Sequence, residues 1–226
     1  MLPDTDHDHY MASLLRGSGD LWRPALEMIA DLHGVAVAGA TPLGVGRNVV
    51  VATSELVVKL VPPFWRHMWW NECEALQHVS GHLSVRTPRL EAAGEIDGWG
   101  YIVMEREAGN SPGWRGDQRS RADRSRLARL QGRLVREVGS LKPIESIRWL
   151  WPEVLADDRA ALADDLVGVP ERLADSAADY VDAAGDLASG DTFLHGDLSS
   201  INILLAPAGD TVLVDWSDAA VGPLDH

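Results

Sequence analysis

The chain has 226 residues but only one cysteine, Cys73. A lone cysteine cannot form a disulfide within the chain, and no Cys/His spacing indicates a structural zinc site. Disulfide-stapled and zinc-stabilised folds are therefore excluded. Free cysteines are usually buried, so we expect Cys73 to lie on the packed face of a helix. With 46% hydrophobic residues, the chain is long enough for one large domain or for two lobes that share a cleft.

Long apolar runs are also absent. No stretch reaches the roughly 18 to 20 uninterrupted apolar residues that span a bilayer. Residues 1–6 lack the basic and then apolar pattern of a signal peptide. We therefore expect a cytoplasmic chain without a membrane partner.

Basic residues are scarce: 20 Lys and Arg stand against 34 Asp and Glu, which gives a formal net charge of −14. A chain with this charge repels phosphate backbones, so we expect no nucleic-acid partner. Arginines gather once, between 115 and 136, but they fall on several sides of a predicted helix and are interrupted by acids. That pattern favours a solvated helix surface.

Residues 141–192 have the opposite bias, with 12 acidic against 4 basic residues. Such a surface would attract a cationic substrate, and it is also typical of solvated acidic helices. Both interpretations stay open at this stage.

The first half of the chain predicts an antiparallel sheet with one crossover helix. A loose, polar segment over 1–20 precedes a helix over about 21–33, which Gly34 ends. Short β-branched or apolar runs follow at 35–38, 49–52 and 56–61. A helix is predicted over 70–79, and a hairpin over 90–96 and 101–104.

The second half is mainly helical in its pattern. Helices are predicted over about 119–140, 153–167 and 170–188, and two short strands over 203–205 and 211–214 close the chain. The organisation we expect is an N-lobe over 21–104, a hinge or linker over 105–116 and a helical C-lobe over 117–226.

The densest chemical signal is His195-Gly196-Asp197, followed by Asn202 and then by Asp215-Trp216. Phosphoryl transfer needs one carboxylate to orient or deprotonate a hydroxyl group, and hard oxygen ligands to hold magnesium on a triphosphate. A loop and a short hairpin between these residues would return Asp215 beside Asn202. The spacing therefore predicts a phosphotransferase site.

This spacing resembles the catalytic loop and metal-binding aspartate of the protein-kinase-like fold. His-Gly-Asp and Asp-Trp are similar to the aminoglycoside phosphotransferase and choline kinase family, and the resemblance covers roughly 35 to 225. It implies an α+β, bilobal fold, ATP and Mg²⁺ as cofactors, and a small-molecule hydroxyl as acceptor. It also implies Asp197 as the catalytic carboxylate, with Asn202 and Asp215 as metal ligands.

Lys59 supports this resemblance from the first half of the chain. It stands inside an apolar strand, where a charge needs a partner or must reach the surface. The resemblance implies that Lys59 contacts the α- and β-phosphates while paired with an acid of the next helix. We prefer Glu72 for this pair, because Glu74 points about 200° away on a helix.

The resemblance also assigns the nucleotide-binding segments. Residues 43–51 are similar to a glycine-rich loop that has Gly44 and Gly46 on the phosphates and Val51 over adenine. Residues 101–109 are similar to the inter-lobe hinge, where Met104 would line the rear of the adenine pocket. The Glu105 carbonyl and the Glu107 amide would bind the adenine edge.

Several points stay open in the sequence. We expect His195 to be structural, and Asp218 and Asp225 stay unassigned. Most relatives continue well beyond the position of His226, so we expect a short member of the family or a piece of a longer protein. The acceptor is an aminoglycoside as first candidate, with another antibiotic, choline or a metabolite alcohol as alternatives. A non-catalytic ATP-binding module is the rival interpretation.

Overall fold

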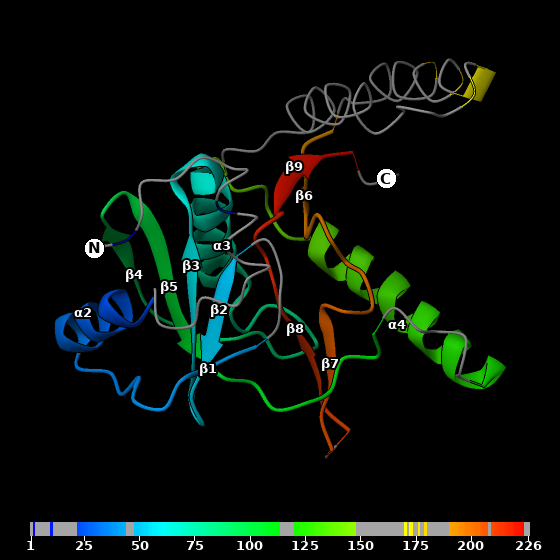
Figure 1. The fold of residues 1–226 in the computed structure, drawn as a ribbon. Coiled ribbons are helices and arrows are strands. Elements are labelled where there is room, and N and C mark those ends of the chain that lie inside the picture. Colours follow the sequence, from blue (N-terminus) through cyan, green and yellow to red (C-terminus); the bar gives the residue numbers. More distant parts are fainter. Residues whose placement is uncertain are drawn as a thin grey trace.

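The computed structural model describes residues 2, 10, 22–43, 48–113, 120–147, 170, 172–173, 176, 179, 190–207 and 209–223. Its N-lobe contains a five-stranded antiparallel sheet in the order β1-β2-β3-β5-β4 (Figure 1). The strands are β1 (Thr41–Pro42), β2 (Val49–Ala52), β3 (Leu56–Val61), β4 (Leu90–Ile96) and β5 (Trp99–Glu105). The predicted N-terminal antiparallel sheet is confirmed.

The β4–β5 hairpin forms at the Asp97-Gly98 turn that the sequence predicts. Both residues have left-handed backbones, with φ of 53° and 80°. Two successive positive φ values match the twist of the flanking strands, and Asp-Gly tolerates them at low cost. The hairpin brings the end of β5 beside β3, where Glu105 pairs with Leu56.

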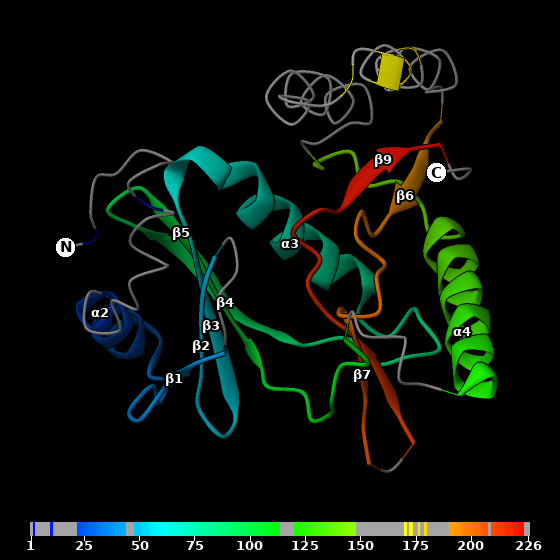
Figure 2. The ribbon, with the colours of Figure 1, turned by 45° about the vertical axis from the view of Figure 1, so that its right-hand side comes forward.

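Helices cover both faces of this sheet. Helix α3 (Arg66–Val79) follows a 3₁₀ turn at Pro63–Trp65 and lies between the sheet and the C-lobe strands (Figures 1 and 2). It begins four residues before the predicted start at 70, and it buries Cys73 as expected. Helix α2 (Arg23–His33) covers the opposite face and ends at Gly34, whose backbone is left-handed.

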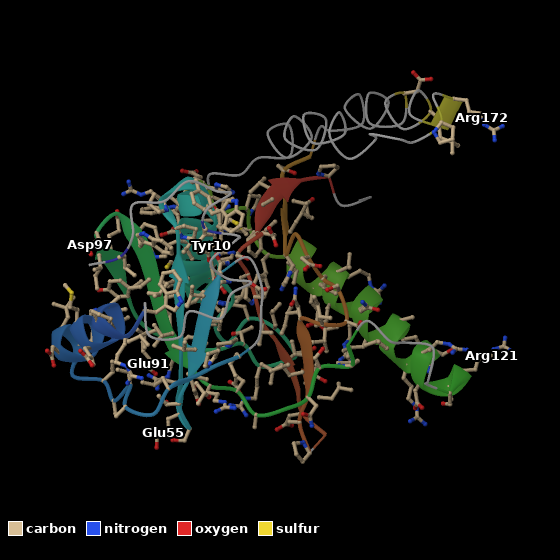
Figure 3. The ribbon with its side chains drawn as sticks, viewed as in Figure 1. Tyr10, Glu55, Glu91, Asp97, Arg121 and Arg172 are labelled. Atoms are coloured by element: carbon tan, nitrogen blue, oxygen red, sulfur yellow. The ribbon has the colours of Figure 1, made fainter. Side chains whose placement is uncertain are left out.

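The outer face of the sheet carries an aromatic core together with α2. Tyr10 is fully buried there and makes edge contacts with Trp22, Phe64, Trp65 and Trp99. Figure 3 labels Tyr10 beside the N-lobe sheet. Leu2 is also buried, and its backbone amide donates to the Asp97 carboxylate. The prediction of a loose, solvated segment over 1–20 is therefore wrong at both residues, because they supply apolar surface to this core.

The C-lobe contains helix α4 (Arg121–Gly139) and two small antiparallel sheets. One sheet pairs β6 (Thr192–Leu194) with β9 (Ala220–Gly222), and the other pairs β7 (Ile203–Leu205) with β8 (Thr211–Leu213). Ser120 caps α4 by accepting from the Asp123 amide. The described arginines of α4 are exposed, as the charge pattern predicted.

A second core joins the two lobes through α3. It includes Met68 and Leu76 of α3, Ile102 of β5, and Phe193 and Trp216 of the C-lobe. The rings of Phe193 and Trp216 stack with centroids 6.0 Å apart. Because α3 contributes to both lobes, its packing fixes where the N-lobe sheet stands relative to the C-lobe strands.

Two parts of the predicted secondary structure differ from the fold. Residues 35–38 form no strand, because the Ala40 amide donates to the Val37 carbonyl and turns the chain before β1 begins. Strands β6 and β9 were not predicted, because they pair with each other across a long separation in the sequence, whereas β7 and β8 are joined by one turn. The helices predicted over 153–167 and 170–188 fall almost entirely outside the described residues. Within the described part, no helix is long and apolar enough to cross a membrane.

Candidate active site

A cleft of about 380 Å³ lies between the lobes. Both lobes contribute apolar side chains and charged or polar side chains to its lining. The apolar lining residues are Leu43, Val50, Val57, Pro88, Met104, Leu204 and Val214. The polar lining includes Asn48, Lys59, Glu72, Asp215 and Ser217. A flat apolar ligand with a charged tail would fit this arrangement.

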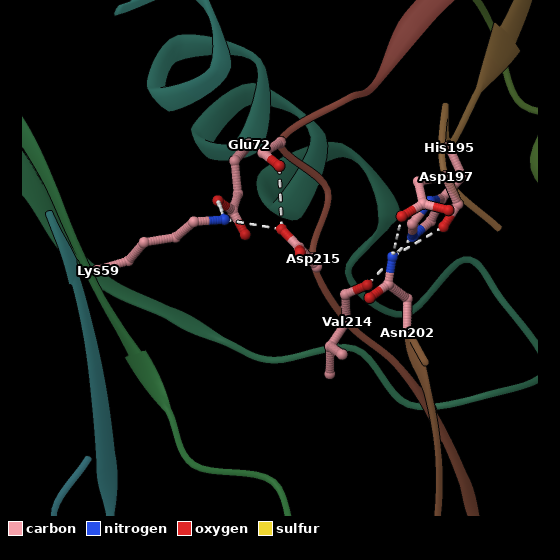
Figure 4. A network of polar contacts seen from close by, with 8 residues as sticks. Lys59, Glu72, His195, Asp197, Asn202, Val214 and Asp215 are labelled. Atoms are coloured by element: carbon pink, nitrogen blue, oxygen red, sulfur yellow. Dashed lines mark hydrogen bonds and ion pairs between the residues drawn. The ribbon is translucent and has the colours of Figure 1, made fainter. Parts of the chain in front are cut away.

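Lys59 connects the two lobes at the polar end of the cleft. Its Nζ lies 2.7 Å from Glu72 Oε2 on α3 and 2.7 Å from Asp215 Oδ1 after β8 (Figure 4). The predicted Lys59–Glu72 pair is confirmed. Glu74, the alternative partner, hydrogen-bonds the Ser146 hydroxyl instead.

The three charges shift one another's pKa values. Burial would lower the pKa of Lys59, but Asp215 and Glu72 outweigh it and the pKa is raised. Lys59 lowers the pKa of Asp215 to about 2. Burial, with the charge of Asp215, raises the pKa of Glu72 although Lys59 opposes this. At neutral pH the site therefore holds a charged lysine and an ionised Asp215.

Ser217 holds Asp215 in place. Its hydroxyl donates to Asp215 Oδ1 over 3.0 Å, so this oxygen accepts hydrogen bonds from both Ser217 and Lys59. Asp215 has φ of 62°, a left-handed conformation that is uncommon for a residue with a side chain. The two donors and the buried Trp216 that follows hold it there.

Asp197 and Asn202 form the second polar group of the site. The Asn202 amide nitrogen donates to both the backbone carbonyl and Oδ2 of Asp197, each over 2.9 Å. The Val214 amide donates to the backbone carbonyl of Asn202 over 2.9 Å, which places Asn202 beside the residue before Asp215 (Figure 4). The predicted return of the hairpin to Asn202 is thus observed.

Gly196 allows the backbone before Asp197 to approach its neighbour closely. Its φ is 81°, and a Cβ at this position would lie only 1.7 Å from the Asp218 carbonyl oxygen. A side chain here would push Asp197 away from Asn202. The requirement for glycine in His-Gly-Asp is therefore steric.

His195 is buried two residues before Asp197. Its Nε2 lies 3.2 Å from the Val214 carbonyl oxygen, and its ring lies 4.4 Å from the Trp216 ring. Its Nδ1 is buried without a hydrogen-bond partner among the described residues. Burial lowers the pKa of His195 to about 4, so the ring is neutral at physiological pH. These contacts support the structural role that the sequence suggested.

An ion pair between Arg86 and Glu107 fixes the predicted hinge segment. Arg86 contacts the Glu107 carboxylate over 2.8 Å, and the Glu107 side chain is buried. The Glu105 amide donates to the Arg89 carbonyl and the Arg106 amide to the Glu55 carbonyl. Met104, Glu105 and Glu107 all line the cleft, as their predicted hinge role requires.

The donor chemistry of the loop fits a magnesium ion. Asn202 uses its amide nitrogen for Asp197, and Asp215 uses Oδ1 for Lys59 and Ser217. Neither set of bonds occupies the side-chain oxygen Asn202 Oδ1 or the carboxylate oxygen Asp215 Oδ2, and both are hard oxygen donors. Among the described residues no cluster of three or more His, Cys, Asp or Glu side chains could hold a metal alone. An ion held by Asn202 and Asp215 would therefore need further oxygen ligands, because magnesium takes six.

The structure corrects one predicted cleft residue. Val51 packs into the outer core, whereas Val50 lines the cleft. Because side chains alternate along β2 and Val50 pairs with Lys59, the cleft face is set by Val50. Gly44 and Gly46 lie outside the described residues. Sequence reasoning also missed Asn48, Arg86 and Ser217. The cleft face of Asn48 and Val50 follows from the pairing of Val50 with Lys59, which alternation along one strand does not reveal.

The family model described as "Phosphotransferase enzyme family" matches residues 44–226. Curated protein sequences give no match. The fold is similar to the kanamycin and GDP complex of APH(2")-IIia, with 18% identity, a TM-score of 0.72, and coverage of 90% of this chain and 75% of that one.

Two further solved structures have the same fold. The streptomycin and ATP complex of APH(2")-IIa has 16% identity and a TM-score of 0.61, with 89% of this chain and 72% of that one covered. A macrolide 2'-phosphotransferase from Brachybacterium faecium has 19% identity and a TM-score of 0.60, with 88% and 73% covered. At such identities the likeness establishes a bilobal kinase-like fold.

Proposed function

The chain belongs to the phosphotransferase enzyme family, and from that premise we propose that it transfers the γ-phosphate of ATP to a hydroxyl group of a small molecule. The observation that carries the proposal is the joint placement of Lys59, Glu72 and Asp215 within 2.7 Å contacts beside the Asp197–Asn202 pair. In this proposal the interlobe cleft is the nucleotide site, and the Asp197 carboxylate stands beside it, outside the residues that line the cleft.

The apolar end of the cleft is the adenine site in this proposal. Val50 and Val57 would cover one face of the base, and Leu204 and Val214 the other. Met104 would close the rear, and the Glu105 carbonyl and Glu107 amide would bind the adenine edge. The Arg86–Glu107 ion pair supports this role, because it holds the hinge backbone in one position.

The charged end would position the phosphates. Lys59 carries a positive charge to the α- and β-phosphates, and Glu72 keeps its ammonium group in place. Asn202 and Asp215 would hold Mg²⁺, which supplies charge neutralisation on the triphosphate when bound. With the pKa of Asp215 lowered to about 2, its carboxylate is ionised and ready to act as a ligand at any physiological pH.

Asp197 would orient the acceptor hydroxyl and take its proton. As the acceptor oxygen bonds to the γ-phosphorus, the bond from phosphorus to the β,γ-bridging oxygen breaks and ADP leaves. The hydrogen bond from Asn202 fixes the Asp197 carboxylate during this step. An aminoglycoside is the first candidate for the acceptor, and another antibiotic, choline or a metabolite alcohol are alternatives.

Calorimetric titration with MgATP, followed by ADP release with a panel of aminoglycosides, macrolides and small alcohols, tests the proposal. We expect saturable MgATP binding and ADP release that depends on one class of acceptor. Binding without turnover on any acceptor would favour a non-catalytic nucleotide-binding module, and absence of binding would refute the proposal.

A further inference from the structure

Asn48 is a buried polar residue of the cleft that the mechanism above does not use. It is 8% exposed and lines the cleft together with Lys59 and Asp215. Its side-chain Oδ1 is buried and has no hydrogen-bond partner in the described part of the chain. An unpaired buried polar atom costs about 1 to 3 kcal/mol, so its presence in a native cleft calls for an explanation.

The register of the sheet determines which part of the cleft Asn48 faces. Ala52 pairs with Val57, which in turn pairs with Met104 next to the hinge. Two residues further from the hinge, Val50 pairs with Lys59. Asn48 stands two residues further still and points to the same face as Val50, because side chains alternate along a strand. Asn48 therefore lies beyond Lys59 on the side away from the hinge.

This position corresponds to the phosphate end of the proposed nucleotide. If adenine lies at the hinge and Lys59 meets the α- and β-phosphates, the next groups along the cleft are the terminal phosphates. Glu72 and Asp215 already supply two carboxylates at this end. A neutral side chain that can donate hydrogen bonds therefore suits a triphosphate better here than a further acid.

The chemistry of an amide suits both groups that a terminal phosphate brings. Its NH₂ donates to phosphate oxygens, and its carbonyl accepts from a water molecule held by the phosphates or their counter-ion. The two orientations of the amide differ only by a half-turn about the last torsion. After the half-turn the NH₂ group stands at the unpartnered position and donates to a phosphate oxygen, and without it the carbonyl oxygen accepts from a water molecule bound there.

We infer that Asn48 is a nucleotide-binding residue of the N-lobe that contacts the terminal phosphates of MgATP through its side-chain amide. The inference rests on the proposed function, since it takes the cleft to be a nucleotide site. It adds a side-chain ligand to the phosphate site, next to the charge of Lys59. It also predicts how the affinity depends on the ligand. The contribution of Asn48 must appear only for ligands that carry phosphates.

The test compares MgATP, MgADP and adenosine binding to the wild-type chain and to Asn48→Leu by calorimetry. Leucine keeps the size of the side chain but removes both polar atoms. We expect MgATP affinity to fall roughly 10- to 100-fold, the range for a hydrogen bond to a charged group, while adenosine affinity stays unchanged. Asn48→Asp should weaken MgATP binding further, because it adds a negative charge.

Val50→Ala is the matched control. Val50 lines the same cleft on the hinge side of Asn48, so its truncation should weaken MgATP and adenosine by the same factor. Equal losses for both ligands in Asn48→Leu, or no loss for either, would overturn the inference. Failure of the wild-type chain to bind MgATP would instead remove the proposed function and this inference with it.

Discussion

The two polar groups of the site are built on opposite principles. The Lys59 group joins three charges across the lobes, and both Lys59 and Glu72 are almost fully buried. The Asp197 group belongs to one loop and pairs a single carboxylate with a neutral amide. In the first group opposite charges stabilise one another, and the ion pair between Lys59 and Asp215 also helps to hold the two lobes together. The second leaves Asp197 available for a ligand, so its loss should affect chemistry more than folding.

Replacement of Asp197 should show the largest effect on activity. We expect Asp197→Ala to lower acceptor-dependent ADP release roughly 100- to 10,000-fold, because it removes the group that takes the hydroxyl proton. Its MgATP affinity and urea midpoint should stay close to those of the wild type. A large loss of stability would show that the loop group also holds the fold, which would remove the contrast.

Replacement of Lys59 should show the opposite balance. Lys59→Met leaves the buried Glu72 carboxylate without its cation, and we expect it to destabilise the chain by about 3 to 5 kcal/mol in urea unfolding.

The double variant Lys59→Met/Glu72→Gln is the matched control. It removes the buried charge as well, so it should recover much of the lost stability while staying unable to bind MgATP tightly. Equal stability of the single and double variants would show that Glu72 does not depend on Lys59.

His195 should make stability sensitive to acid. The folded chain binds a proton on His195 only near pH 4, whereas the unfolded chain binds it near 6.5. The unfolded state therefore holds more protons in this window, and stability falls by up to about 3 kcal/mol as the pH drops through it. The Asp215 contribution is lost only between about pH 3.8 and 2, below this window.

Urea unfolding of the wild type and His195→Gln at pH 7 and pH 5 measures this effect. The wild type should lose more stability than the variant over that interval. The same loss in both proteins would show that His195 is protonated in the folded chain as readily as in the unfolded one.

Ser217 should show the smallest effect. Ser217→Ala removes one of the two donors to Asp215 Oδ1, and we expect a loss of about 1 kcal/mol in stability and a few-fold weaker MgATP binding. Ser217→Thr keeps the hydroxyl and should restore the affinity. If threonine failed to restore it while the fold stayed intact, the hydrogen bond would not be what positions Asp215.

Sequence patterns predicted the elements that local residues specify. The Asp97-Gly98 turn, the β2 and β3 strands and the helix that carries Glu72 follow from turn chemistry and periodicity. The Lys59–Glu72 contact could be predicted because a lysine inside an apolar strand needs an acid nearby. By contrast, β6 and β9 are specified by long-range pairing, which a three-residue segment does not reveal.

The errors in the site have a similar origin. Val51 was assigned to adenine by motif alignment, but the side-chain direction on β2 depends on its pairing with β3. Tyr10 belongs to the outer core because of four aromatic rings distant in sequence, which no local pattern around it indicates. Arg86 acts through its contact with Glu107, which only the folded chain brings about, whereas Ser217 bonds Asp215, two residues before it in the sequence.

The most direct test of the account is ³¹P NMR of the purified chain incubated with MgATP and with the acceptor that gives the fastest ADP release. We predict a phosphate monoester signal on the acceptor with the wild type and none above background with Asp197→Ala, although both proteins bind MgATP equally. An ester formed at the same rate by Asp197→Ala would contradict the assignment of Asp197. The absence of any ester from a wild-type chain that binds MgATP and releases ADP would contradict phosphoryl transfer to the acceptor hydroxyl.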